Sequence, residues 1–523
     1  MPDTLSRESS GEVSMPLQPG YRAAGLLLHA TSLPSRYGIG DIGPSAFQWI
    51  DQLHDTGLGW WQSLPLGPTG YGDSPYQSLS TFAGNGLLMS PDLLIEDGLL
   101  QPAECKGSFS STSIDYDVVI PFKHKLLKVL WNRFASGARK DLIPEYEEFC
   151  SQNAGWLEDY ALFRAIRAKY NNAYYLDWPE ELVRRVPSAL EQARRFLANE
   201  VDQVRLAQFL LFRQGRRLKE YAHRKGVRLI GDLPFFVSPD SSDVWAHPEL
   251  FLLDEARRPL AVAGVPPDYF SATGQLWGNP VYDWDTLAST GYDWWIERVR
   301  ALLNQVDLVR LDHFRAFAAA WHVPAGAPTA EIGEWMPGPG ARLFYALQTE
   351  FGSLPFIAED LGVITPDVVL LRDQFRIPST RVLQFAFDGE PDNIHLPENY
   401  VSNIVVYTGT HDNATTREWF QSLPERDRQT FWEYRRQPEG EFRDVAPQLI
   451  QLAWASKARL AIAPFQDLLN LGSRGRMNTP GTSAGNWRWR ATRQMLATSN
   501  FGWLKDQTRI CGRVARVSGE AVA

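Results

Sequence analysis

Cysteine and long apolar segments are both scarce in this sequence. Only three of the 523 residues are cysteines, namely Cys105, Cys150 and Cys511, and no two of them form a CxxC pair. An odd number of widely spaced cysteines argues against a disulfide framework and is typical of a reducing compartment, so we expect a cytoplasmic protein. No run of about 18 apolar residues occurs, and therefore no membrane span or membrane partner is expected.

Basic charge is also limited. The chain carries a net charge of −9 and shows no basic patch, which argues against nucleic acid as a partner. The first 20 residues are Ser-rich and partly acidic, and they lack the apolar stretch of a secretory signal. We expect residues 1–20 to form a disordered N-terminal tail and residues 511–523 to form a C-terminal tail.

Aromatic residues, in contrast, are abundant, with 19 Trp, 18 Tyr and 27 Phe. One interpretation is a large core that is rich in aromatic side chains. The other is a set of flat platforms that contact the apolar CH faces of sugars. Composition alone does not decide between these two interpretations.

Short apolar runs recur along the chain and predict eight β-strands. Near-continuous apolar runs are typical of strands that are buried on both faces of a parallel sheet. The expected strands span residues 24–30, 58–66, 227–234, 306–312, 356–360, 381–387, 403–408 and 460–465. Helical patterns lie between them, over residues 44–53, 204–221, 294–303, 341–351 and 446–458, and from Thr365 onward.

Alternating strands and helices predict an α/β fold, and eight βα units predict a closed (β/α)8 TIM barrel over residues 21–510. The connection between the second and third strands is too long for one helix. Residues of about 70–200 are therefore expected to form an inserted, mainly helical subdomain. A second long connection, over about 238–285, is rich in Pro, Gly and aromatic residues and is predicted to be a lid loop.

Carboxylates follow several of the expected strands, where barrel enzymes hold their active sites. One strand ends on Asp312, and Arg310 lies two residues earlier, so both side chains point to the same face. A cation beside a carboxylate lowers its pKa, and we expect Asp312 to be ionised for this reason. A structural ion pair would show the same pattern. Asp232 also falls near the end of a strand, the third.

Two further strands end on acids. Glu359 follows an apolar run that could desolvate its carboxyl group and raise its pKa toward neutrality. His411 and Asp412 are possible metal ligands, but no second His or Cys lies at ligand spacing, so we expect no metal and no cofactor. Hydrogen bonding to sugar hydroxyls is the other role for this pair. Three strand-end carboxylates indicate glycoside chemistry, with one nucleophile and one general acid/base.

Loops rich in glycine and aromatic residues follow some of these strands. Residues 67–76 lack the Lys-Ser/Thr ending of a phosphate-binding loop, so that interpretation fails. The loops present either sugar-binding surfaces or ordinary turns with aromatic packing. For the segment after the eighth strand, the alternative to sugar binding is a C-terminal cap of the barrel. The candidate sugar-binding residues of these loops are Tyr76, Asp268, Gln275, Trp277 and Asn486.

Together these motifs resemble those of the 4-α-glucanotransferases known as amylomaltases or disproportionating enzymes, which form glycoside hydrolase family 77 of the α-amylase superfamily. The resemblance extends over nearly the whole chain, from about residue 25 to residue 490. The matching stretches are LHATSLPSRYGIGDIG (28–43), LPLGPTGYGDSPYQSLSTFAGN (64–85), GDLPFFV (231–237), PPDYFSATGQLWGNPVYDW (266–284), VRLDHFRAF (309–317), IAEDLG (357–362), GTHDN (409–413) and GNWRWR (485–490).

The resemblance implies a role for each candidate residue. Asp312 would be the nucleophile and Glu359 the general acid/base, and Asp412 would stabilise the transition state through contacts with sugar hydroxyls. The side chains that would support the reacting sugar are Tyr76, Asp232, Arg310 and His411. Gln275 and Trp277 would lie on the lid near the acceptor. The family also lacks the separate C-terminal β-domain of typical amylases.

The implied reaction is transfer of an α-1,4-glucan segment to the 4-hydroxyl of an acceptor glucose or glucan by a retaining double displacement. α-1,4-Glucans and maltooligosaccharides would be the binding partners, and a monomer or weak homodimer is expected. Two alternatives stay open: an α-amylase-like hydrolase with the same carboxylates, and an inactive glucan-binding protein. An unrelated aldolase is not expected, because none of the eight strands ends in lysine.

Overall fold

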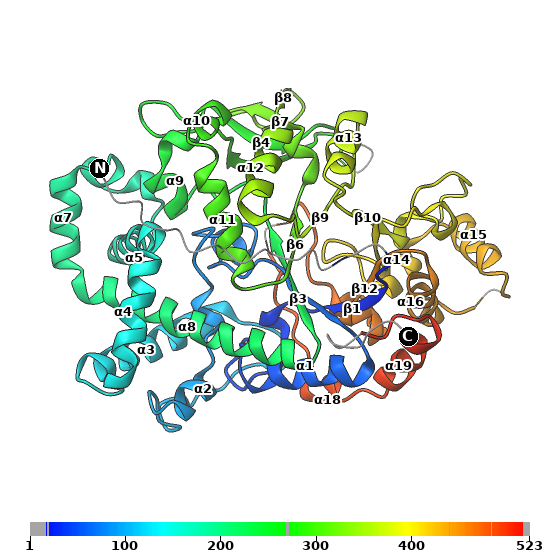
Figure 1. Ribbon diagram of the computed structural model, residues 1–523, viewed down its shortest axis with the longest axis horizontal. Helices are drawn as coiled ribbons and strands as arrows, with labels where there is room; N and C mark the ends of the chain where they lie inside the picture. The colour runs from blue at the N-terminus through cyan, green and yellow to red at the C-terminus, as the bar shows by residue number, and fades with distance from the viewer. Residues whose placement is uncertain (1–16, 18–19, 268–270, 439, 483, 516–523) are drawn as a thin grey trace.

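A closed barrel of eight parallel strands lies at the centre of the molecule (Figure 1). The structure is a computed structural model that describes residue 17 and residues 20–267, 271–438, 440–482 and 484–515. The strands follow one another around the barrel in the order β1-β12-β11-β10-β9-β6-β3-β2. They are β1 (Ala23–Leu27), β2 (Trp60–Gln62), β3 (Arg228–Leu233), β6 (Leu308–Leu311), β9 (Phe356–Ala358), β10 (Ser379–Val382), β11 (Ile404–Tyr407) and β12 (Leu460–Pro464). The predicted barrel is confirmed.

The first and last strands close the barrel. Ala23 pairs with Leu460 in a parallel ladder, and Gly25 on the other edge of β1 pairs with Trp60. Every residue of β1, β11 and β12 is buried, as expected for strands that are covered on both faces. Glycine is required at position 25, because a Cβ there would lie 2.5 Å from the carbonyl oxygen of Trp60.

Several predicted strands extend beyond the strands of the structure, and the run 381–387 shows the physical reason. The apolar run 381–387 predicted a strand, but β10 ends at Val382 and the next three residues, Leu383–Phe385, form a 3-10 turn. The backbone N–H of Val382 donates to His395 Nδ1 at 3.1 Å, and the ladder with β11 stops at the same residue. The prediction for residues 383–387 is therefore wrong, since apolar character reports burial and not strand pairing.

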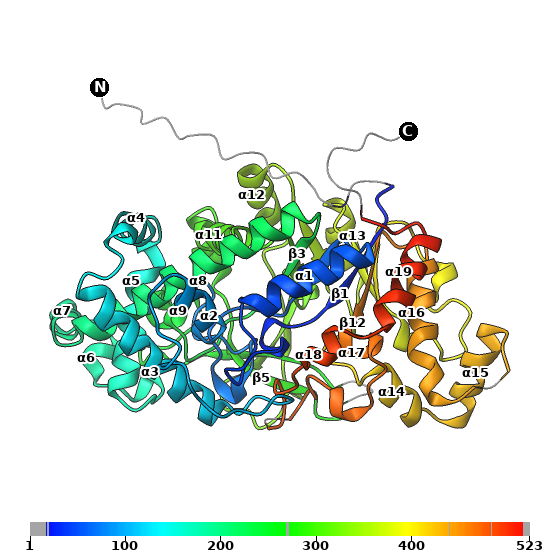
Figure 2. The same cartoon turned by 90° about the horizontal axis from the view of Figure 1, so that it is seen from below.

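Helices surround the barrel and connect its strands. They are α1 (Pro44–Thr56), α2 (Pro91–Glu96), α3 (Tyr116–Ala135), α4 (Ile143–Gln152), α5 (Ala154–Lys169), α6 (Glu180–Val183), α7 (Pro187–Phe196), α8 (Ala198–Arg224), α9 (Ser242–Ala246), α10 (Trp284–Ser289), α11 (Asp293–Leu303), α12 (Ala341–Phe351), α13 (Pro366–Gln374), α14 (Thr416–Ser422), α15 (Glu425–Arg435), α16 (Val445–Ala455), α17 (Phe465–Leu468), α18 (Arg493–Leu496) and α19 (Asn500–Ile510). Helices α3 to α7 gather at one end of the molecule in both Figure 1 and Figure 2. Within the described ranges, no helix is both long and apolar enough to cross a membrane.

A second, antiparallel sheet was not predicted from the sequence. Its strands, in the order β5-β4-β7-β8, are β4 (Ala261–Val265), β5 (Gln275–Pro280), β7 (Ala319–Pro324) and β8 (Glu334–Pro337). Two of them lie in the segment 238–285, and the other two follow β6. These strands are short and partly exposed, and they include Gly and Pro, so they lack a clear strand pattern.

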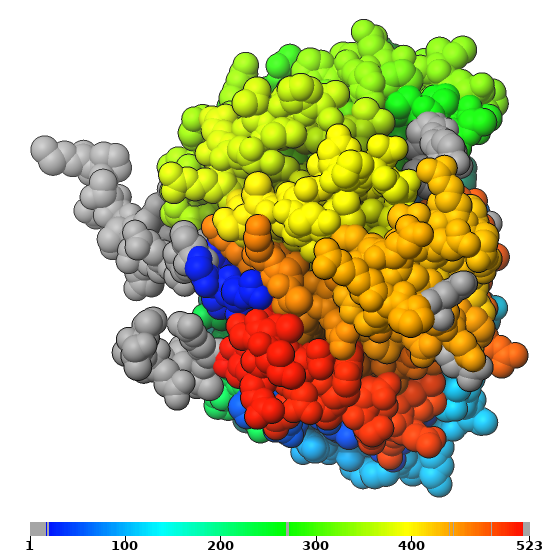
Figure 3. All heavy atoms as spheres, turned by 90° about the vertical axis from the view of Figure 1, so that its right-hand side faces the viewer, coloured from blue at the N-terminus to red at the C-terminus, as the bar shows by residue number. Residues whose placement is uncertain are grey.

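The C-terminal segment packs against the start of the barrel. The side chain of Arg513 is fully buried and donates to the carbonyl oxygens of Ala23 at 2.9 Å and Trp454 at 2.6 Å. The backbone N–H of Ala515 donates to the carbonyl of Gly57 at 2.8 Å. In Figure 3 this segment, in red, lies next to the blue N-terminal residues. Residues up to 515 therefore belong to the packed structure, although 511–523 was expected to be a tail.

Candidate active site

An arginine and two acids meet at the carboxyl ends of β3 and β6. Arg310 Nη1 donates to both carboxylate oxygens of Asp232 at 2.8 Å and to Asp312 Oδ1 at 3.0 Å. Arg310 and Asp232 are buried and face each other across the β3–β6 ladder. Although burial lowers it, the pKa of Arg310 is raised well above its usual value by the two carboxylates. The structure thus brings these three candidate residues together.

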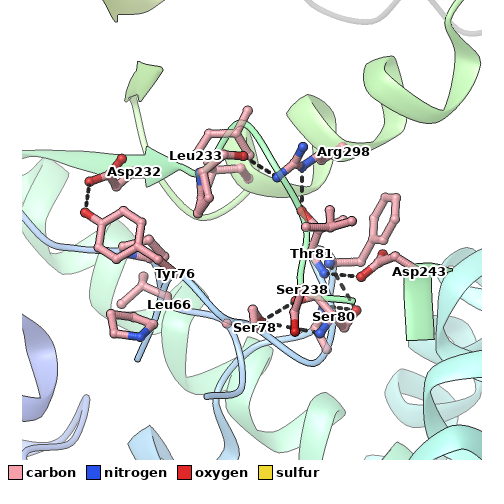
Figure 4. A pocket seen from close by; sticks show the side chains of 18 of the residues that line it. Leu66, Tyr76, Ser78, Ser80, Thr81, Asp232, Leu233, Ser238, Asp243 and Arg298 are labelled. Atoms are coloured by element: carbon pink, nitrogen blue, oxygen red, sulfur yellow. Dashed lines mark hydrogen bonds between the residues drawn. The ribbon is translucent and has the colours of Figure 1, made fainter. Parts of the chain in front are cut away.

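The loop after β2 adds Tyr76 to this group. Its hydroxyl donates to Asp232 Oδ2 at 2.7 Å, and its ring stacks on that of His411 with centroids 5.1 Å apart. Burial and the charge of Asp232 raise the pKa of Tyr76 well above its usual value, so the phenol stays protonated and donates. Figure 4 shows Tyr76 and Asp232 on one side of a small cavity of about 50 Å³, with Arg298 and Asp243 on the other side.

Asp412 approaches from the segment that follows β11. Asn478 Nδ2 donates to Asp412 Oδ1 at 2.6 Å, and His411 Nε2 lies 3.4 Å from the same oxygen. Burial lowers the pKa of His411, so its ring is neutral at pH 7. The Asp412 side chain keeps 46% of its surface exposed, which leaves this carboxylate accessible to a ligand.

Glu359 follows β9 and has a different set of partners. Its Oε2 accepts a hydrogen bond from the backbone N–H of His313 at 2.7 Å. No Lys, Arg or His in the described part of the chain lies within ion-pair distance of it. Burial raises the pKa of Glu359 to about 8, against the influence of Arg310. The expectation that apolar surroundings raise this pKa agrees with the structure.

The pKa of Asp312 departs from the expectation. Burial raises it to about 7, and Asp232 and Asp412 add to the increase while Arg310 opposes it. The prediction of a lowered pKa is wrong, because one guanidinium is shared by several nearby acids. Both pKa values are raised, and only Asp312 contacts Arg310 directly. The guanidinium stabilises the ionised form of Asp312, so a proton shared by this pair is favoured on Glu359.

A separate ion pair anchors the strand end that carries Glu359. Asp360 is buried and accepts hydrogen bonds from Ser379 Oγ at 2.6 Å, from the Thr380 N–H at 2.8 Å and from Arg372 Nη1 at 2.5 Å. Strands β9 and β10 share a single ladder pair. The bonds of Asp360 therefore link the two strands at the point where their backbone pairing ends.

The remaining candidates lie on surrounding loops and on β5. Trp277 contacts the ring of His313 with centroids 4.8 Å apart, and its Nε1 donates to Gln275 Oε1 at 3.2 Å. Trp277 therefore contacts the residue that follows Asp312 at the end of β6, and Gln275 is linked to it through Trp277. Asn486 instead hydrogen bonds two backbone groups of its own loop, at 3.0 and 2.9 Å. Asp268 lies outside the described residues.

Reasoning from the sequence missed two residues of this site, His313 and Asn478. His313 bonds Glu359 through its backbone and meets Trp277 through its ring, and its position directly after Asp312 was the available signal. Its φ of 48° is uncommon for a residue with a side chain. Asn478 bonds Asp412 from a loop 66 residues away in sequence, and no sequence pattern indicates that pairing.

A closed parallel barrel with acids gathered at the carboxyl ends of its strands is typical of barrel enzymes that process glycosides. Comparison with known proteins defines the group more closely. Residues 28–496 match the family described as 4-alpha-glucanotransferase. The 4-alpha-glucanotransferase of Synechocystis sp. is 49% identical over 497 residues, which cover 94% of this chain and 98% of that protein. The 4-alpha-glucanotransferase of Thermus thermophilus is 47% identical, with 90% and 94% covered.

Solved structures agree with this result. The amylomaltase from Streptococcus agalactiae, solved in complex with acarbose, matches with a TM-score of 0.91 at 36% identity. The match covers 94% of this chain and 100% of that one. The chain therefore belongs to the 4-α-glucanotransferase family, glycoside hydrolase family 77, and the resemblance inferred from its motifs is confirmed.

Proposed function

We propose that this protein is a 4-α-glucanotransferase that acts on α-1,4-glucans by a retaining double displacement. Membership of the family supports the activity. The observation that carries the chemistry is the contrast between Asp312, which accepts a hydrogen bond from Arg310, and Glu359, which has no cation within ion-pair distance among the described residues and accepts a hydrogen bond from the backbone N–H of His313. A nucleophile must be ionised and a general acid must be protonated, and this contrast favours that distribution of one proton.

In the first step, Asp312 attacks the anomeric carbon while Glu359 protonates the glycosidic oxygen. The bond to the leaving glucan breaks, and a covalent glycosyl-enzyme forms on Asp312. In the second step, Glu359 accepts the proton of an acceptor 4-hydroxyl, whose oxygen displaces Asp312. A new α-1,4 bond forms, and both carboxyl groups return to their starting protonation states.

The other candidate residues hold the sugar or the catalytic groups. Arg310 orients Asp312, and the hydrogen bond from Tyr76 to Asp232 fixes the other partner of that guanidinium. Asp412 accepts hydrogen bonds from sugar hydroxyls. The residues assigned to glucan and acceptor contacts are His411, Asp268, Gln275, Trp277 and Asn486. Aromatic side chains such as Trp277 exclude water, which favours transfer over hydrolysis.

Three broader expectations belong to the same proposal. The protein works in the cytoplasm, in keeping with Cys105, Cys150 and Cys511, which are free thiols. It acts as a monomer or weak homodimer. Its catalytic domain spans residues 21–510 together with the packed C-terminal residues up to 515, with the insertion at about 70–200 and the lid at about 238–285.

Incubation of the purified protein with maltotriose and no cofactor tests the activity, with products resolved by size. We expect free glucose and a ladder of longer maltooligosaccharides. Glucose and maltose without longer products would instead identify a hydrolase on the same scaffold. An unchanged substrate, with longer donors as well, would favour a glucan-binding protein without activity.

A further inference from the structure

A groove separate from the candidate active site lies where the inserted helices meet the barrel. It has a volume of about 430 Å³ and is bordered by α4, α5, α8 and the end of α11. None of the candidate catalytic or sugar-binding residues that the structure describes lines this groove. Leu66 and Gln305 line both the groove and the small cavity beside Asp232, so the groove adjoins that cavity.

Three aromatic side chains form a continuous surface in this groove. Phe149, Trp156 and Phe212 are each half-buried. The ring centroid of Phe212 lies 6.0 Å from that of Trp156 and 5.5 Å from that of Phe149. Trp156 also stacks on the buried ring of Phe82, with centroids 6.5 Å apart, which holds it in place. Partly exposed, neighbouring rings offer apolar ring faces to a ligand.

Polar side chains accompany these rings. Gln152 is exposed and its Nε2 donates to Glu148 Oε1 at 3.0 Å, while Gln305 Nε2 donates weakly to a backbone carbonyl at 3.4 Å. Asn304 is exposed at the same border. A side-chain amide or carboxylate can form several hydrogen bonds, so these groups retain capacity for a ligand.

The charges of the groove balance one another. Its lining includes two acids, Glu145 and Glu148, and two arginines, Arg213 and Arg216. Glu145 forms ion pairs with both arginines, one of them at 3.2 Å. The groove therefore favours a neutral ligand with many hydroxyl groups over a phosphate or another strongly charged molecule.

Gly215 lies in the interior of α8 and lines the same groove. Glycine inside a helix is less favourable than alanine. No positive φ requires glycine at this position, and a Cβ there would meet no atom within 4 Å. The missing side chain leaves the wall of the groove open and allows a ligand to approach the helix closely.

We propose that this groove binds a segment of α-1,4-glucan at a distance from the catalytic acids. The aromatic surface contacts the CH faces of glucose units, and the amides and Glu148 bond their hydroxyls. The choice of glucan as the ligand rests on the proposed function. A long chain that occupies the groove and the active site together binds more tightly than one held at either site.

Replacement of Gly215 with Leu tests this inference, because leucine favours the helix but fills the groove. Binding is measured by retardation in native gels that contain amylopectin, in an Asp312→Asn background that prevents turnover. We expect Gly215→Leu to raise the apparent dissociation constant for amylopectin about tenfold. The KM for maltotriose, measured with Asp312 intact, should change less than about twofold, since a short substrate does not reach both sites.

The matched control is Gly502→Leu, since Gly502 is an exposed helical glycine in α19 at which a Cβ would likewise meet no atom within 4 Å. It should bind amylopectin like the parent. Trp156→Ala, which removes the aromatic surface without filling the groove, should weaken binding as Gly215→Leu does. Amylopectin binding that Gly215→Leu and Trp156→Ala leave unchanged would overturn the inference. Failure of the maltotriose assay alone would overturn the proposed function and leave a groove-dependent amylopectin affinity intact.

Discussion

The ends of β6 and β9 place two half-buried acids, Asp312 and Glu359, beside different partners. At β6, Asp312 shares the guanidinium of Arg310 with a second carboxylate. At β9, Glu359 accepts a hydrogen bond from the backbone N–H of His313. The neighbouring Asp360 accepts one from the guanidinium of Arg372. Burial raises the pKa of both Asp312 and Glu359, so burial does not distinguish them. The positions of Arg310 and Arg372 distinguish them, because Arg310 contacts Asp312 and Arg372 contacts Asp360. Glu359 contacts neither arginine and is therefore the better general acid.

The strongest test of this comparison removes the proposed nucleophile at β6. Asp312→Asn keeps the shape of the side chain but cannot form the glycosyl-enzyme. We expect maltotriose disproportionation to fall by about 10⁴-fold or more. Thermal unfolding and far-UV circular dichroism should show an intact fold. Substantial residual turnover in this variant would place the nucleophile elsewhere.

Removal of the cation at β6 should have the next largest effect. Arg310→Met leaves Asp232 and Asp312 without their shared partner, and the Asp232 side chain is fully buried. We expect the free energy of unfolding in urea at pH 7 to fall by about 3–5 kcal/mol. The double variant Arg310→Met/Asp232→Asn should recover part of this loss. A double variant as unstable as the single one would show that the loss has another cause.

The bonds of Asp360 that anchor the end of β9 can be weakened without substitution of Glu359. Asp360→Asn removes the ion pair with Arg372 and loosens the link between β9 and β10. We expect kcat on maltotriose to fall by up to about 10²-fold through misplacement of Glu359, with a smaller change in KM. Asp373→Asn removes the exposed partner of the same arginine and is the control. Equal losses in both variants would argue against positioning by Asp360.

The smallest expected effect concerns stability and pH. The pKa of Glu359 is about 8 in the folded protein, above its unfolded value of about 4.3. The folded state therefore binds more protons between these values, and the stability contributed by this group is lost as the pH rises toward 8. In Glu359→Gln this loss is absent.

We thus expect Glu359→Gln to be more stable than the parent at pH 8, by about 1 kcal/mol or more, and close to it at pH 4. Denaturant unfolding at several pH values measures the difference. Glu255→Gln, which removes a carboxylate at an exposed position, is the control. A parent and a Glu359→Gln variant whose stabilities run in parallel from pH 4 to pH 8 would contradict the raised pKa.

Much of the barrel was predictable because its strands are buried on both faces. Runs such as Leu460–Pro464 carry no polar residue, so composition alone marks them. The sheet that contains Trp277 was not predictable, since its strands are partly exposed and pair with segments distant in the chain. The hydrogen bond from Asn478 to Asp412 was not predictable either, because these residues are distant in the chain.

Local sequence determined where the acids stand: a strand of alternating faces places Arg310 beside Asp312, and an apolar run leads to Glu359. Tertiary structure alone decided how each acid is solvated and which partner it has. Desolvation depends on every atom around a group, so it raised the pKa of Asp312 despite the adjacent arginine. Tyr76 bonds Asp232, and Arg372 bonds Asp360, although the two members of each pair lie on different elements. Only the closed barrel brings these elements together.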